Sequence, residues 1–262
     1  MTAATAVLSI LCGSLVGLSL GLIGGGGSIL AVPLMAYVVG LPPHAAIGTS
    51  AVAVAASALA NRGGHARART VKWPCALVFA VSGVAGAAIG AQIGKRVDGQ
   101  ALLAAFGVLM IAVAALMLRP RRDGHDPDVR LTRVSAARLL PPLAGTGLAV
   151  GALSGFFGIG GGFLIVPGLI SATAMPLLNA IGSSLVSVAT FGATTAVSYA
   201  ASGLVEWRVA GLFIVGGLAG GYAGIEAAKA LAERKRMLAV IFSMVVAVVG
   251  LYVIARGLGH FA

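Results

Sequence analysis

Long runs of apolar residues alternate along this chain with short segments rich in glycine, proline or basic residues. Each long run has about 15–21 residues, close to the ~20 that a helix needs to cross the hydrocarbon core of a membrane. The runs lie at 5–22, 46–60, 74–93, 101–118, 180–200, 208–225 and 237–255. This pattern predicts an all-α integral membrane protein that crosses the bilayer several times.

The apolar pattern occurs twice, at a constant offset in residue number that holds without a gap for about a hundred residues. The segment from Gly21 to Pro33 recurs from Gly155 to Pro167. At this repeat offset, Ile47-Gly48-Thr49-Ser50 recurs as Ile181-Gly182-Ser183-Ser184. Duplicated units punctuated by glycine are typical of secondary transporters, whose substrate site lies where the two copies meet. Transport is therefore the leading functional hypothesis.

Each copy is expected to hold five helical pieces. They lie at about 5–22, 28–40, 46–60, 74–93 and 101–118, and again at about 142–157, 162–174, 180–200, 208–226 and 236–255. The second piece of each copy has only some 12–13 residues, or about 18–20 Å of helix, against about 30 Å of hydrocarbon. Broken helices, half-helices in a re-entrant pair, and two full crossings are all compatible with this length.

Composition narrows the class further. Hydrophobic residues make up 59% of the chain and charged residues only 10%, against about 25% charged residues in soluble proteins. The net charge of +11 comes from loops between the apolar runs, so the orientation of the chain in a bilayer explains it better than binding of nucleic acid. No nucleophile–base pair and no cluster of metal-ligating residues is visible, so we expect neither an enzyme, a cofactor nor a metal site.

Loop charge also predicts a topology. The basic loop 61–73 and the basic linker 119–138 are expected to be cytoplasmic. In the second copy the basic loop comes one connection later, at 229–236. This shift predicts two inverted transmembrane repeats, 1–118 and 139–262, with both termini outside the cell. Parallel copies would result instead if the first two pieces of each copy crossed only once.

The sharpest local features are two glycine clusters, Gly24-Gly25-Gly26-Gly27-Ser28 and Gly158-Ile159-Gly160-Gly161-Gly162. Adjacent glycines disfavour a helix by roughly 1 kcal/mol each, and a break at membrane depth leaves N–H groups that must be buried or face a polar cavity. Free N–H groups at the start of the next helix, reinforced by its dipole, form a natural anion site. The alternative is close helix packing, which is the preferred explanation for the isolated, regularly spaced glycines of the fourth pieces.

Hydroxyl groups form a second feature, at the start of the third piece of each copy. They belong to Thr49, Ser50, Ser183 and Ser184, and Ser187 follows one turn later. Such hydroxyls can cap helix N–H groups or donate to an oxyanion, and both roles stay open. No Asp, Glu, Lys or Arg lies near the middle of a predicted span, so the sequence marks no proton relay and leaves the coupling ion open.

Together these motifs resemble the TauE/SafE family of membrane permeases, also called sulfite exporters. The resemblance rests on Gly21–Ser28 running to Pro33, on Ala46–Ser50, and on the recurrence of this set at the repeat offset. It covers roughly 8–118 and 142–255. It implies a transporter of small anions in the inner membrane of a bacterium, with the glycine clusters and the paired hydroxyls lining the substrate path. The copies differ at several positions, so the resemblance implies no symmetric site.

The sequence therefore predicts a permease for a small anion, with a sulfur oxyanion or organosulfonate such as sulfite or sulfoacetate as the favoured substrate. Its expected partners are that anion and the lipid bilayer, and a second copy of the chain is a further candidate. A carrier of another small solute such as a carboxylate, and a membrane scaffold that does not transport, are the alternatives. The expected substrate-binding residues are Gly24, Gly25, Gly26, Gly27, Ser28, Thr49, Ser50, Gly158, Gly160, Gly161, Gly162, Ser183, Ser184 and Ser187.

Overall fold

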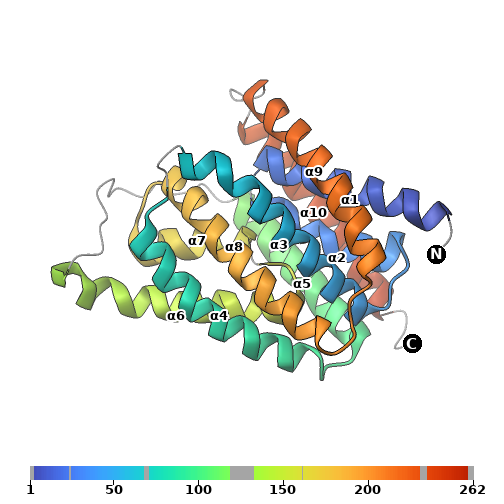
Figure 1. Cartoon of the computed structure of the whole chain (residues 1–262), viewed down its shortest axis with the longest axis horizontal. Coiled ribbons are helices and arrows are strands. Elements are labelled where there is room, and N and C mark those ends of the chain that lie inside the picture. Colours follow the sequence, from blue (N-terminus) through green and yellow to red (C-terminus); the bar gives the residue numbers. More distant parts are fainter. Residues whose placement is uncertain are drawn as a thin grey trace.

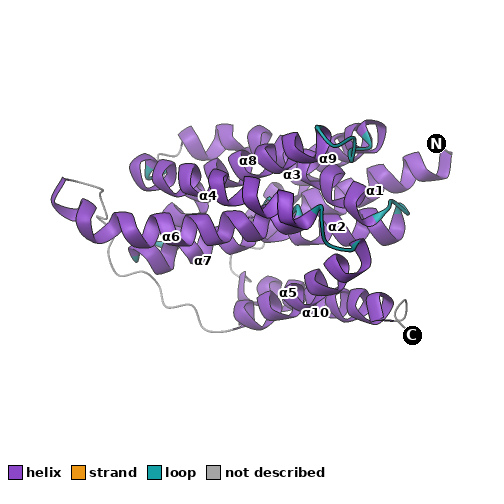
Figure 2. Cartoon of the chain, turned by 90° about the horizontal axis from the view of Figure 1, so that it is seen from below, coloured by secondary structure: helices purple, strands orange, loops and turns teal. Residues whose placement is uncertain are grey.

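The computed structural model describes residues 3–23, 25–67, 71–118, 133–160, 162–230 and 235–258, and every regular element in these ranges is helical (Figure 2). In chain order the elements are α1 (Ala3–Ile23), η1 (Gly25–Leu30), α2 (Ala31–Pro33), η2 (Leu34–Val38), α3 (Pro43–Arg67), α4 (Trp73–Gly94), α5 (Gly99–Leu118), α6 (Arg133–Phe157), α7 (Gly162–Thr173), α8 (Leu177–Ala200), α9 (Trp207–Ala230) and α10 (Lys235–Leu258).

Seven of the described helices, α1, α4, α5, α6, α8, α9 and α10, are long and apolar enough to cross a membrane. The apolar part of α3, Pro43–Leu59, is shorter, as are Gly27–Val38 and α7. The predicted all-α multi-pass membrane protein is therefore confirmed. Two boundaries differ clearly. The helix α3 continues to Arg67, into the segment expected to be a loop, and α6 begins at Arg133, inside the segment expected to be a linker, and runs through Pro141 and Pro142.

Spaced glycines hold α1 against α9 and α4 against α6. A Cβ atom added at these glycines would collide with backbone of the facing helix, so the helix axes approach as closely as backbones allow. The facing positions in α1 and α9 are Gly13 with Phe213, Gly17 with Gly217, and Gly21 with Gly221. Those in α6 and α4 are Gly147 with Phe79, Gly151 with Gly83, and Gly155 with Ala87. The two sets are related by the repeat offset, so the same parallel contact occurs twice. The packing role predicted for the glycines of the fourth pieces is confirmed for Gly86, Gly90, Gly220 and Gly224, where a Cβ would collide with backbone of the facing helix.

Two further pairs of helices run antiparallel. In α3 and α8, Gly48 faces Tyr199 whereas Ala55 faces Gly192. The helices α5 and α10 lie side by side along one edge of the bundle (Figure 2), and the Ser243 hydroxyl of α10 donates to the Ala114 carbonyl of α5 over 2.7 Å. In each pair the two helices match at the repeat offset, so helices that match in sequence run in opposite directions.

The short elements η1, α2 and η2 form one broken segment that runs back along α1. At its start, a Cβ at Gly27 would collide with the backbone of Ser19 and Leu20, near the end of α1. After its end, Leu41 lines a groove together with Thr5, from the start of α1. The segment therefore passes through most of the depth of the bundle instead of turning back, as a re-entrant pair would.

The directions of the helices place each connection between consecutive helices at one of the two ends of the bundle. The helices α3, α5 and α9 finish, and α4, α6 and α10 begin, at one end, which we call the basic end. Among the residues that the structure describes, the basic residues at this end are Arg62, Arg67, Lys72, Arg133, Arg138, Lys229, Lys235 and Arg236, whereas Lys95, Arg96, Arg208 and Arg256 lie at or toward the other end. Both chain termini lie at the opposite end (Figure 1).

The helix contacts predict different effects for two glycines of α6. Gly151→Ala places a methyl group against the backbone of Gly83, whereas a Cβ at Gly145 meets nothing within 4 Å. We expect Gly151→Ala to destabilise the protein by about 1–3 kcal/mol and Gly145→Ala to be neutral or slightly stabilising because alanine favours helix. Thermal unfolding of the two purified variants in detergent tests this, and equal melting temperatures would show that the contact is not tightly packed.

Candidate functional site

The glycine turn between α6 and α7 has a backbone suited to binding an anion. Gly158 and Gly160 have φ of +67° and +66°, both in the left-handed region, whereas Ile159 between them does not. Alternation of this kind turns successive N–H groups toward one point, which makes an anion-binding concavity. Neither glycine can carry a side chain, because a Cβ at Gly158 would collide with Ile47 and one at Gly160 would lie 2.8 Å from Val54 Cγ1.

This turn lies at the middle of the bundle, where α3 and α8 cross. A Cβ at Gly160 would also lie 3.5 Å from Val188 Cγ1, and both valines are central residues of their helices. The helix α7 starts at Gly162, so the unpaired N–H groups of its first turn open at this depth. The positive end of the α7 dipole adds to the attraction for negative charge.

Two serine residues lie in the helices that flank the turn, Ser154 in α6 and Ser187 in α8. Ser154 and Ser187 are fully buried, and within the described ranges neither hydroxyl has a hydrogen-bond partner. Ser154 lies one turn after Val150, which contacts Gly168 of α7, so it is on the face of α6 that meets α7. Ser187 precedes Val188, the residue that lies against Gly160. A buried hydroxyl without a partner costs about 1–3 kcal/mol, so an occupant that accepts these hydrogen bonds is favoured.

Of the predicted hydroxyls, Ser50 is the one that holds the turn. Its Oγ donates to the Ile47 carbonyl over 2.9 Å and to the Gly158 carbonyl over 3.2 Å. The Ile159 N–H in turn donates to the Ser154 carbonyl over 3.3 Å. Ser50 is thus a positioning residue, because it fixes the turn from the first copy. The matching Ser184 hydroxyl donates to the Ile181 carbonyl over 2.8 Å.

Thr49 and Ser183 form a reciprocal pair of hydrogen bonds between the copies instead of joining the turn. The Glu206 N–H donates to Thr49 Oγ1, and the Lys72 N–H donates to Ser183 Oγ, each over 3.0 Å. Glu206 and Lys72 immediately precede α9 and α4. The expected capping role therefore acts across the copies, on a helix of the other half.

The first glycine cluster is only partly described. Gly24 and Gly161 fall outside the described residues, whereas Gly25, Gly26 and Gly27 belong to the 3₁₀ helix η1. Ser28 is fully buried in the same element, and Gly162 is the first residue of α7. Ser154 was missed by sequence reasoning, since its only signal is a serine one turn before the second cluster, where the first copy has Leu20.

The rest of the site carries no charge and no metal-ligating group. In the part of the chain that the structure describes, no three His, Cys, Asp or Glu side chains gather where they could hold a metal ion. Further along α8, the hydroxyls of Thr190 and Thr194 donate to carbonyls of their own helix. The donors that the described residues present around the turn are therefore neutral backbone N–H groups and hydroxyls.

Comparison with known proteins gives the family and its general role. The family model described as sulfite exporter TauE/SafE matches residues 9–253. A probable membrane transporter protein of Xylella fastidiosa strain 9a5c is 49% identical over 257 residues, which cover 98% of this chain and 97% of that protein. The probable membrane transporter protein YunE of Bacillus subtilis is 28% identical over 270 residues, which cover 96% of this chain and 98% of that protein. No solved structure matches the chain. The resemblance seen in the sequence motifs is thus confirmed over nearly the whole chain.

The reciprocal hydrogen bonds predict that Thr49 acts through stability. Thr49→Val removes the acceptor of the Glu206 N–H, and a typical hydrogen bond within a protein contributes about 0.5–1.5 kcal/mol to stability. Thr49→Ser keeps the hydroxyl and should restore most of the stability. Melting curves of both variants in detergent check this, and a Thr49→Val protein as stable as the wild type would mean that the bond contributes nothing.

Proposed function

The chain belongs to the TauE/SafE family of membrane transporters, and we propose that it is a permease that carries a small anion through the middle of its helix bundle. The observation that carries the proposal is the pair of fully buried, unpartnered hydroxyls of Ser154 and Ser187 beside the Gly158–Gly160 turn. Backbone N–H groups, the N-terminus of α7 and these two hydroxyls are donors without a fixed charge in this part of the bundle.

The chemistry of these donors favours an oxyanion of low basicity. Hydrogen bonds to an ionised acceptor are roughly twice as strong as neutral ones, so several neutral donors hold such an anion without a buried Arg or Lys. A fixed cation at this depth would carry a large desolvation cost. The family's description as sulfite exporters supports a sulfur oxyanion or organosulfonate, such as sulfite or sulfoacetate, as the substrate.

The proposed orientation of the chain in the membrane follows from the distribution of its basic residues. Because basic residues gather on the cytoplasmic side of membrane proteins, the basic end faces the cytoplasm and both termini face outward, in the inner membrane of a bacterium. The two transmembrane repeats are then inverted about an axis in the membrane plane. This arrangement is supported by the antiparallel pairs α3–α8 and α5–α10, whose members match at the repeat offset.

The proposal predicts that Ser154→Ala and Ser187→Ala weaken anion binding without loss of stability, because neither hydroxyl has a partner in the described protein. A lost hydrogen bond to a charged group costs about 1.5–3 kcal/mol, or roughly 10- to 100-fold in affinity. Binding is measured as the rise in melting temperature with sulfite, sulfoacetate, sulfate or chloride, and transport as anion flux into proteoliposomes.

Ser9→Ala is the matched control, since Ser9 is equally buried but its hydroxyl donates to the Thr5 carbonyl of its own helix over 2.7 Å. It should keep wild-type binding and flux. If both Ser154→Ala and Ser187→Ala transport every anion like the wild type, the proposed site is wrong. If the wild-type protein neither binds nor transports any of these anions, the result favours the alternative of a membrane scaffold that does not transport.

The proposed orientation predicts which added cysteines are accessible from outside. Both native cysteines, Cys12 and Cys75, are buried, so they give little background. A membrane-impermeant maleimide should label Ala262→Cys in intact cells, whereas Gly124→Cys in the linker should react only after the cells are permeabilised. The reverse pattern would contradict the orientation, and equal labelling of both would contradict a basic end on one side of the membrane.

A further inference from the structure

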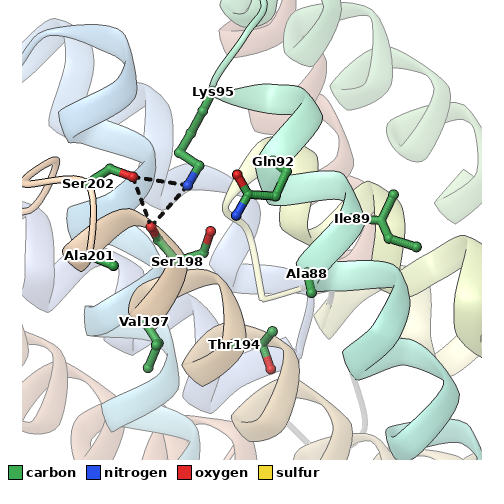
Figure 3. Close-up of a pocket in the computed structure, with 9 residues that line it drawn as sticks. All are labelled: Ala88, Ile89, Gln92, Lys95, Thr194, Val197, Ser198, Ala201 and Ser202. Atoms are coloured by element: carbon green, nitrogen blue, oxygen red, sulfur yellow. Dashed lines mark hydrogen bonds between the residues drawn. The ribbon is translucent and has the colours of Figure 1, made fainter.

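A groove of about 690 Å³ lies between α4 and α8, at the end of the bundle opposite the basic end (Figure 3). It is lined by Ala88, Ile89, Gln92, Lys95, Thr194, Val197, Ser198, Ala201 and Ser202. Lys95 lies at the end of α4, and Ser198 and Ser202 lie at the end of α8, whereas Ile89 lies deeper along α4. The apolar Ile89 and Val197 are 54% and 69% exposed. Exposed apolar side chains on a membrane-spanning helix face lipid, so the groove opens sideways into the bilayer.

Lys95 supplies a cation at the mouth of this groove. Its Nζ donates to the Ser198 carbonyl over 3.2 Å and to Ser202 Oγ over 3.0 Å, and it lies 5.9 Å from the centre of the Tyr199 ring. The ammonium group has three N–H donors, and two of them have acceptors in the described protein. The two bonds anchor Lys95 at the end of α8, and the third donor is left for a ligand.

The hydroxyl of Ser198 points to a ligand independently of Lys95. Its Oγ is buried from solvent, yet it has no hydrogen-bond partner among the residues that the structure describes. Figure 3 shows this hydroxyl turned toward the side-chain amide of Gln92 across the groove. A charged donor and two neutral ones therefore surround the same space, and no lining residue is acidic.

The hydroxyl donors of the groove are present in only one of the two copies. The lysine recurs at the repeat offset as Lys229, but the positions that match Thr194, Ser198 and Ser202 hold Ala60, Gly64 and Ala68. Capping of a helix end by lysine is common and would need none of these hydroxyls. The hydroxyls are therefore a feature of this groove and not of the repeated scaffold.

We propose that the groove binds one anionic phospholipid. Its phosphate accepts hydrogen bonds from Lys95, Ser198 and Gln92, and an acyl chain lies over Ile89 and Val197. The depth of Ile89 below Lys95 fits a phospholipid. Ile89 precedes Lys95 by less than two turns, or about 9 Å of helix, and this is about the distance from a lipid headgroup to the upper part of its acyl chains. Basic pockets between membrane helices bind lipid headgroups in this way. The site is separate from the glycine turn, so it does not depend on the transported anion.

The test compares lipids and variants on the full-length protein. Phosphatidylglycerol added to the delipidated protein in detergent should raise its melting temperature more than phosphatidylcholine does, and native mass spectrometry should detect one retained phosphatidylglycerol. Lys95→Ala should remove this selectivity. Ser198→Ala should weaken phosphatidylglycerol binding about two- to tenfold, the effect of one hydrogen bond, because it leaves the Lys95 bond to the Ser198 carbonyl intact.

Arg96→Ala is the control, since it removes the same charge from an exposed neighbour of Lys95 that does not line the groove; it should bind phosphatidylglycerol like the wild type. Wild-type binding by Ser198→Ala would overturn the proposal and leave Lys95 as a helix cap alone. Equal stabilisation by soluble glycerol phosphate would overturn it in favour of a free anion. Loss of selectivity in Arg96→Ala as well would reduce the effect to general surface charge.

Discussion

Every backbone polar group within a membrane must find a partner inside the protein, and this constraint determines how the Gly158–Gly160 turn can exist. The carbonyl of Gly158 accepts from Ser50, and the N–H of Ile159 donates to the Ser154 carbonyl. The helix start that follows leaves further N–H groups at the crossing of α3 and α8. A break held this way by α3 and by the end of α6 presents its donors at a defined place in the bundle.

Close glycine contacts provide the frame around this break. The pairs α1–α9 and α4–α6 pack backbone against backbone along much of their length, so they leave α3, α8 and the broken segments enclosed between them. The hydrogen bonds of Thr49 and Ser183 join the two copies. Because α3 and α8 run antiparallel, these two bonds lie toward opposite ends of the bundle. The copies are thus tied near both ends, with the turn between the ties.

The sequence was most informative where a local property decides the structure. Apolar length predicted the spanning helices, and glycine spacing predicted the close contacts of Gly83, Gly217 and their neighbours. The start of α6 was missed because Pro141-Pro142 and the polar residues before them are typical of a loop. The course of the broken segment and the bonds of Thr49 and Ser183 depend on groups far away along the chain, and the burial of Ser154 depends on α7. No local pattern encodes these.

The scaffold is duplicated, but its chemistry is not. Both unpartnered hydroxyls beside the turn, Ser154 and Ser187, belong to the second copy, and the matching positions of the first copy hold Leu20 and Ala53. The first copy contributes Ser50, which orients the turn. A two-fold arrangement with equivalent donors would create two half-sites around the axis, whereas a small anion fills only one. In the proposed site, the hydroxyls of the second copy therefore define a single binding position, while the repeated glycine contacts build the frame that surrounds it.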